Sequence, residues 1–138
     1  MNSLDDKRLP AVLMASSSSE LLQRYALGER DFPGSRLDDA NLTRADLSGA
    51  DLSRVHLQYA YLAGAKLKGT NLSQALLNGV QLVGADLRNA NLSISNLSEA
   101  ELSGADLRDA VMKTADLRGA DISNANLSCV NLSGADLR

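Results

Sequence analysis

Charged side chains that recur at every twentieth position are the first candidates for chemistry in this sequence. Lys68, Arg88 and Arg108 follow this spacing, and so do Asp86 and Asp106. If positions related in this way are neighbours in space, the three cations form a basic ridge that could bind an anion or a phosphate. The two carboxyl groups would be a candidate general acid–base pair, which needs two different environments so that their pKa values separate. Both interpretations depend on the elements that position these side chains.

The single histidine and the single cysteine limit the remaining chemistry. Neither a Cys/His metal cluster nor a disulfide framework can be built from them. No serine, cysteine or carboxylate pocket converges on His56, so we interpret it as a solvated side chain. We interpret Cys129 as a free surface thiol, with a link between two copies of the chain as the alternative. We therefore predict no metal site and no cofactor.

The composition allows one domain with a modest core. The chain has 138 residues, of which 44% are hydrophobic, 22% charged and only 3% aromatic. It is therefore not a disordered chain, and its core must be built from leucine and alanine. A formal net charge of −3 excludes a broadly basic nucleic-acid binder. No apolar run approaches ~18 residues, the length that a membrane-spanning helix needs. From the charge we therefore expect no nucleic acid as partner, and from the missing apolar run no membrane.

An uninterrupted period of five residues determines the architecture. Every fifth residue from Phe32 to Leu137 is apolar, and 19 of these 22 positions are leucine. A small residue, mostly alanine, stands two positions earlier, and Asp or Asn stands between the two at 13 of 20 positions. Successive leucines would drift by about 140° around a helix, and they would alternate between the two faces of a flat strand. The pattern fits a chain that bends once per repeat.

Such a chain is a solenoid in which each repeat forms one side. The alanine and leucine side chains point inward, while the Asp or Asn and the residue after the leucine point outward. The next residue, often Gly or Asn, forms the corner, because these residue types adopt a positive φ at low cost.

These repeats resemble those of the pentapeptide-repeat family, whose motif is A-(D/N)-L-x-x. Residues 45–49, 85–89 and 105–109 read ADLSG, ADLRN and ADLRD, and the resemblance covers about residues 35–138. It implies an all-β solenoid, a right-handed quadrilateral β-helix with four repeats per coil, so that every twentieth residue stacks. On that fold Asp86 and Asp106 are exposed beside arginines. We therefore favour a ladder of charges that cancel over an acid–base pair or an anion site.

Two other sets of outward residues stand out. Asn71, Asn91 and Asn131, interrupted by Val111, would stack as a column of amides that satisfy one another between layers. Apolar residues also occupy outward or corner positions, and the middle group could be the surface that binds a partner, with plain surface variation as the alternative. The candidate interaction surface consists of Tyr59, Tyr61, Leu76 and Val83.

The amino-terminal end carries a candidate cap. The segment from Ser17 to Glu20 is typical of a helix start, and Gly28 can end a helix. We predict a helix at residues 18–28 that packs on the first coil through Leu21, Leu22 and Tyr25.

We accordingly divide the chain into three parts. Residues 1–16 are an N-terminal segment that is flexible or a short helix, with a signal peptide as an alternative. Residues 17–30 hold the capping helix, and residues 31–138 form the β-helix of about five coils.

The last coil shows no comparable cap, since the repeats are still in phase at Arg138. One explanation is a truncated chain or a frayed last coil. The other is an end-to-end contact with a second copy, a homodimer whose contact residues would be Val130, Leu132 and Leu137.

A packed solenoid leaves no cavity, and no motif supplies a nucleophile, a base and oxyanion donors together, so we expect no enzyme. We favour a non-catalytic rigid scaffold or protein–protein interaction module with an unidentified protein partner. The resemblance to small pentapeptide-repeat proteins of photosynthetic bacteria implies a cytoplasmic location.

The alternative function is that of a DNA mimic that binds a type II topoisomerase (gyrase), as some family members do. Mimicry requires a sustained acidic exterior, whereas residues 30–138 carry 13 Asp and Glu against 11 Lys and Arg.

Overall fold

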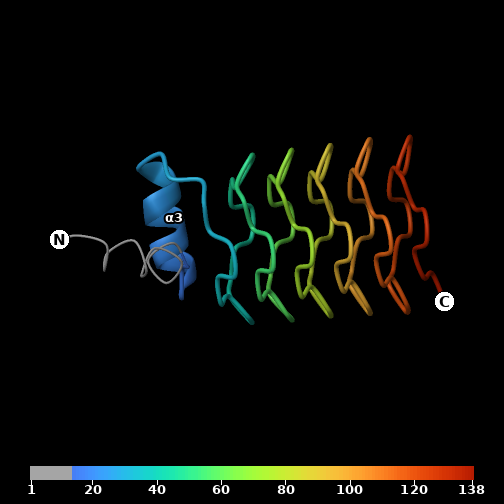
Figure 1. Ribbon diagram of the computed structural model, residues 1–138, viewed down its shortest axis with the longest axis horizontal. Helices are drawn as coiled ribbons and strands as arrows, with labels where there is room; N and C mark the ends of the chain where they lie inside the picture. Colours follow the sequence, from blue (N-terminus) through green and yellow to red (C-terminus); the bar gives the residue numbers. More distant parts are fainter. Residues whose placement is uncertain (1–13) are drawn as a thin grey trace, which may run out of the picture.

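The computed structural model describes residues 14–138, which form a short helix followed by a rod of stacked coils (Figure 1). Helix α3 spans Ser18–Ala26 and is the one helix in this part of the chain. It is too short to cross a membrane, and no other described segment is a membrane-spanning helix. The predictions for the amino-terminal segment before Met14, including the signal peptide, lie outside the described residues.

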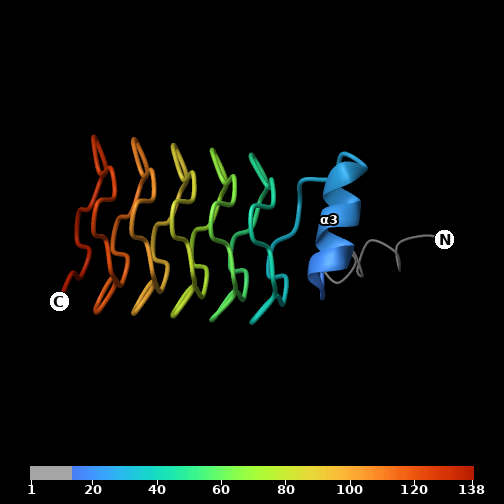
Figure 2. The same ribbon diagram turned by 180° about the vertical axis from the view of Figure 1, so that it is seen from behind.

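Each coil of the rod contains four of the five-residue repeats. Isolated parallel bridges, rather than long strands, join the residue before each inward side chain to its counterpart four repeats later, from Asp31↔Asp51 to Asp116↔Asp136. This register places four sides in each layer. Successive layers lie side by side along the long axis in both views (Figures 1 and 2). The predicted stacking of every twentieth residue is confirmed.

The four sides are numbered by their inward residues in chain order. Face 1 begins at Phe32, face 2 at Leu37, face 3 at Leu42 and face 4 at Leu47, and each face continues one layer at a time through every fourth repeat. The corner between two faces is named after both, so that corner 2–3 joins face 2 to face 3.

Each repeat ends in a tight turn at a corner. The leucine carbonyl accepts a hydrogen bond from the N–H three residues later, as in the 3.0 Å bond from Ala40 N to Leu37 O. The corner residue between them has a positive φ throughout the rod, at nine glycines and at 12 other residues. This is the pattern of a type II turn. The corners at Tyr59 (φ 60°) and Ile94 (φ 59°) show that stacking outweighs a local cost of about 1–2 kcal/mol.

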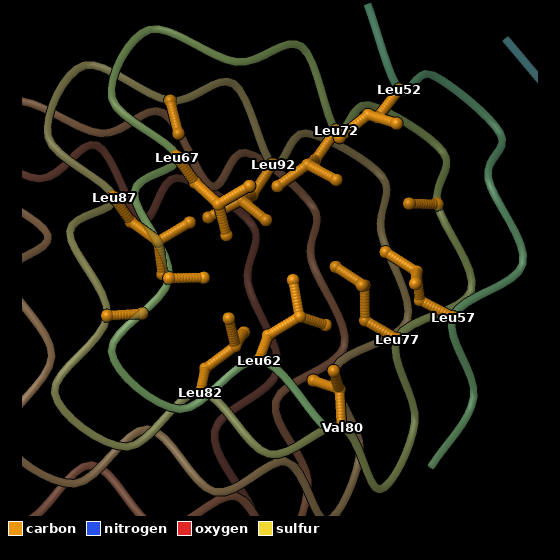
Figure 3. Packing of buried hydrophobic residues seen from close by; sticks show 14 of the residues in the cluster. Leu52, Leu57, Leu62, Leu67, Leu72, Leu77, Val80, Leu82, Leu87 and Leu92 are labelled. Atoms are coloured by element: carbon orange, nitrogen blue, oxygen red, sulfur yellow. The ribbon is translucent and has the colours of Figure 1, made fainter. Parts of the chain in front are cut away.

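The inward leucines of the four faces meet along the axis of the rod. From Leu37 to Leu117 these inward residues are at most 3% exposed. Figure 3 shows Leu57, Leu67 and Leu82 approaching the axis from different sides. Removing each such side chain from water contributes about 2 kcal/mol, so the column of leucines holds the rod together.

The small residues beneath the corners complete the core. Where serine or threonine replaces alanine, the hydroxyl donates to the carbonyl three residues earlier at 2.7–2.8 Å. The buried polar group is therefore satisfied within its own turn. This applies to Ser35, Thr70 and Ser95.

Helix α3 covers the amino-terminal end of the rod (Figure 1). It begins as predicted, with Ser17 as the N-cap whose hydroxyl accepts a hydrogen bond from the Glu20 N–H. It ends at Ala26, two residues earlier than predicted, because Gly28 adopts φ 98° and closes the last turn.

One side of α3 packs on the first coil. Leu21 is fully buried, and the Tyr25 hydroxyl donates to the carbonyl of Ser48 at 2.7 Å. The prediction that Leu22 packs there as well is wrong, because Leu22 is 37% exposed. A step of one residue rotates a helical side chain by about 100°, which turns Leu22 away from the rod.

The backbone just before α3 extends the stack. The Ala15 N–H donates to Ser35 Oγ at 2.7 Å, and the Ala15 carbonyl accepts from the Arg36 N–H at 3.0 Å. Higher in the rod a carbonyl of the preceding coil accepts the equivalent bond, as in His56 N to Ser35 O. The first coil is therefore capped by backbone as well as by the helix.

Candidate interaction surfaces on the rod

The outward Asp or Asn of each repeat is held by its own backbone. In all 13 such repeats after Ala40, the side-chain Oδ1 accepts a hydrogen bond from the N–H two residues later, as in the 3.0 Å bond from Ser73 N to Asn71. The predicted column of mutually bonded amides at Asn71, Asn91 and Asn131 is wrong, because each amide oxygen bonds inside its own repeat. The nearby N–H is the closest donor.

An arginine after the leucine folds back onto the aspartate before it. Arg88 Nη2 lies 2.6 Å from Asp86 Oδ2, and Arg88 Nε lies 2.8 Å from Asp86 Oδ1. The planar guanidinium matches both carboxylate oxygens at once. The same pair forms in every Asp-Leu-Arg repeat of the described chain, namely Asp86–Arg88, Asp106–Arg108, Asp116–Arg118 and Asp136–Arg138.

The predicted basic ridge on face 4 is therefore largely neutralised. Arg88 and Arg108 are engaged by aspartates, and Lys68 is the member that makes no ion pair among residues 14–138. Hydrogen bonds from the arginines lower the pKa of both Asp86 and Asp106. Each carboxyl group is held by its own arginine and neither pKa is raised, whereas the general acid of such a pair needs a raised pKa.

Three predicted surface residues form an exposed group on face 3 and corner 2–3. Tyr59, Tyr61 and Val83 are 56%, 50% and 42% exposed. Tyr61 is bridged to Gln81, so Tyr61 and Val83 lie in adjacent layers of face 3. The Tyr59 ring lies over Gly79, where a Cβ atom would clash with the ring carbons Cδ1 and Cε1. We call Tyr59, Tyr61 and Val83 the tyrosine cluster.

The fourth predicted residue, Leu76, does not belong to this cluster. It lies on face 2, bridged to His56, and both side chains are half-buried. The histidine is therefore less solvated than predicted. Ile94 is well exposed but stands at corner 1–2, on the other side of face 2. Sequence reasoning did not separate these positions by exposure, because all of them are outward in the repeat.

The last described coil contains Val130, Leu132 and Leu137. Val130 and Leu132 are partly buried, and Leu137 is 53% exposed. In lower coils the leucine N–H donates to a carbonyl of the next coil, as from Leu37 N to His56 O. The corner N–H donates in the same way, as from Asp39 N to Gln58 O. The equivalent N–H groups at the end of the described chain have no hydrogen bond within residues 14–138, namely those of Ile122, Asn124, Leu127, Cys129, Leu132, Gly134 and Leu137. The Cys129 thiol is free and exposed.

The described residues enclose no cavity, and no three His, Cys, Asp or Glu side chains among them are placed to hold a metal ion. Leucines fill the axis, so the chemistry of the rod lies on its outer surface. That surface includes charges paired within a repeat, charges that make no ion pair among residues 14–138, and the tyrosine cluster.

Comparisons with known proteins give the family. Pentapeptide repeats match in eight copies over residues 27–58, 56–93 and 95–134. The rod is similar to a pentapeptide repeat protein, Rfr23, from the cyanobacterium Cyanothece 51142, with 28% identity and a TM-score of 0.58 over 87% of this chain and 95% of that one. It is also similar to a pentapeptide repeat protein from the thylakoid lumen of Arabidopsis thaliana, with 28% identity and a TM-score of 0.57 over 78% and 72% of the two chains. No curated protein matches. The protein belongs to the pentapeptide-repeat family, and its fold is the right-handed quadrilateral β-helix of that family.

Proposed function

We propose that this protein is a non-catalytic interaction module whose tyrosine cluster binds a protein partner. The observation that carries the proposal is the exposure of Tyr59, Tyr61 and Val83 on adjoining positions of a rigid backbone. Tyrosine is enriched among the residues that dominate binding energy at protein interfaces. A preorganised surface also loses little conformational entropy on binding.

The rest of the rod supports binding rather than catalysis. Family members are generally structural or interaction proteins without enzymatic activity, and this chain has the same repeats. The aspartates that could act as acids or bases are held in ion pairs with arginines. Without a cavity among the described residues, a substrate would not be desolvated there.

Capture of a partner from a cell extract tests the proposal. The bait is the immobilised protein, and the variant is the double substitution Tyr61→Ser and Val83→Ser. We expect a protein that the native rod retains and the variant does not. The matched control is Ile94→Ser, which removes an exposed aliphatic side chain at corner 1–2 and should retain the partner. Equal retention by all three proteins would refute the proposed surface.

The DNA-mimic hypothesis fits the charge distribution less well. Mimicry needs long rows of unneutralised negative charge, whereas the four Asp-Leu-Arg repeats carry matched opposite charges on faces 2 and 4. A gyrase supercoiling assay with purified protein decides between the two functions. We expect no inhibition at micromolar concentrations of the protein.

A homodimer through Val130, Leu132 and Leu137 stays a separate prediction. It would cover apolar side chains and free backbone donors of the last described coil. Sedimentation of the native protein and of the Leu132→Glu variant measures it, because only a dimer through this coil would dissociate in the variant.

A further inference from the structure

The tyrosine cluster has acidic neighbours that no arginine neutralises. Glu101 and Asp121 follow Tyr61 in one column of face 3, through successive bridges between layers. Glu99 stands at corner 2–3, two layers beyond Tyr59. None of these three carboxylates makes an ion pair with another residue of the described chain.

The repeat sequence explains why Glu101 and Asp121, which stand before an inward residue, are unpaired. An aspartate is neutralised in this rod when the residue after the leucine is arginine. On face 3 that position holds small side chains instead, and no guanidinium can fold back: Ala63, Val83, Ser103 and Ser123.

Among the residues that the structure describes, one cation, Arg44, stands at the corner between face 3 and face 4. Arg44 lies over Gly64, where a Cβ atom would be 3.2 Å from Arg44 Cγ. Arg44 therefore lies beside the first two layers, at the opposite end of the face from Glu101 and Asp121. Toward the amino end this surface therefore holds the tyrosine cluster with Asp39 and Arg44 at its two corners, whereas toward the carboxyl end its charged residues are all acidic among those described.

We infer that the partner of the tyrosine cluster is a basic protein segment, with an apolar side chain followed by arginine or lysine. This inference rests on the proposed function and names the chemistry of its partner. The apolar side chain would pack on Tyr61 and Val83, and the cations would face Glu99 and Glu101. Charge complementarity favours such a segment over an acidic one, and a guanidinium also interacts favourably with a tyrosine ring.

The layer spacing limits the length of the segment. Tyr61 and Glu101 are two layers apart, which is about 10 Å at ~4.8 Å per layer. An extended peptide covers this distance in about three residues. An apolar residue and a basic residue two or three positions apart can therefore reach both parts of the surface.

A short peptide tests the inference directly. The probe is acetyl-Phe-Gly-Arg-Gly-Arg-amide, and its partner peptide has citrulline in place of both arginines, which removes the charge and keeps the shape. Each is titrated into the isotope-labelled protein while the backbone amide signals are followed. We expect the signals of Tyr61, Val83 and Glu101 to move with an apparent Kd about tenfold lower for the arginine peptide. The difference should shrink at about 0.5 M salt.

Two double variants assign the effect to face 3. Glu99→Gln with Glu101→Gln should bring the two peptides to equal affinity. The matched control is Asp46→Asn with Asp109→Asn, which changes the net charge equally on face 4 and its far corner. Asparagine at 46 can keep the hydrogen bond that Asp46 accepts from the Ser48 N–H. The control should preserve the preference for arginine. Thermal denaturation of each variant confirms that the rod is intact.

The outcomes distinguish a failure of the basic-partner inference from a failure of the proposed function. If both peptides shift the tyrosine cluster equally, the basic partner is refuted and the proposed surface stands. Equal loss in the two double variants would mean a nonspecific charge effect and would refute the inference. If neither peptide moves these signals, the inference also fails, and the proposed function is judged by the capture experiment alone.

Discussion

Faces 3 and 4 adjoin along one corner and have the same backbone structure, yet they differ in whether their acidic side chains form ion pairs. On face 4, Asp86 and Asp106 are each held by an arginine two residues later. On face 3, Glu101 and Asp121 have no such partner within the described residues. The difference arises from a single position of the repeat, the residue after the leucine. A surface of this fold is therefore specified separately from its core.

The first prediction tests whether the two faces differ only on the outside. Leu82 and Leu87 lie behind face 3 and face 4, and both are at most 1% exposed. Leu82→Asp and Leu87→Asp each place an unpaired charge on the axis, which costs several kcal/mol. We expect both variants to lose cooperative unfolding in circular dichroism. A folded Leu82→Asp rod beside an unfolded Leu87→Asp rod would show that the core behind face 3 is not equivalent.

The second prediction compares two corners that border face 3. Gly79 and Gly84 have positive φ, so alanine at either position costs about 1 kcal/mol. An alanine at 84 meets nothing within 4 Å, whereas at 79 it meets the Tyr59 ring. Gly79→Ala should therefore displace the ring and destabilise the rod more than Gly84→Ala, as measured by urea denaturation and by the tyrosine ring signals.

The same comparison in a Tyr59→Ala background is the control. Removing the ring should make the two glycine substitutions equal in free energy of unfolding, because the contact that distinguished them is gone. If the difference persists without the ring, the placement of Tyr59 over Gly79 is wrong.

The leucine period was sufficient to predict a solenoid, because only a chain that bends every five residues brings Leu52, Leu57 and Leu62 to one axis. The four repeats per coil and the right-handed sense were implied by the resemblance to the pentapeptide-repeat family. The corner at positive φ followed from the Gly and Asn content of that position. The helix start at Ser17 followed from its capping pattern. These features depend on residue type and spacing alone, so they can be predicted from the amino-acid sequence.

The surface was only partly predictable. Outward positions follow from the repeat, but exposure does not: Leu76 is half-buried between layers while Tyr61 is half exposed. The hydrogen bond within each repeat at Asn71 was missed, because a bond to a nearby N–H depends on the turn geometry. The pairing of Arg88 with Asp86 has a readable signal, the repeated Asp-Leu-Arg triplet.

The third prediction concerns acid and the paired aspartates. Hydrogen bonds from the arginines lower the pKa of Asp86, Asp106 and Asp116, and the pKa of Asp136 falls to about 2. In the unfolded chain an aspartate titrates near ~3.9. The folded rod therefore binds fewer protons just below that pH, and the stability from these pairs is present above about pH 4 and lost as the pH falls through the lowered pKa values.

Urea denaturation at about pH 5 and about pH 2.5 measures this loss. Arg88→Gln combined with Arg108→Gln should reduce the fall in stability between the two pH values. Lys68→Gln is the matched control, since it removes a cation of the same ridge that makes no ion pair among the described residues. A fall that is equally steep in all three proteins would show that the pairing does not stabilise the rod.

The smallest expected effect comes from removing one acidic side chain from each of the two faces. Asp86→Ala removes an ion pair and the hydrogen bond from the Arg88 N–H, and we expect a loss of at most about 1 kcal/mol in the free energy of unfolding. Asp86→Asn can keep the hydrogen bond and should lose less. Glu101→Ala removes no ion pair or hydrogen bond within the described residues and should change stability by less than about 0.5 kcal/mol. A larger loss at Glu101 than at Asp86 would contradict this prediction, because the Glu101 carboxylate would then stabilise the rod without any ion pair or hydrogen bond among the described residues.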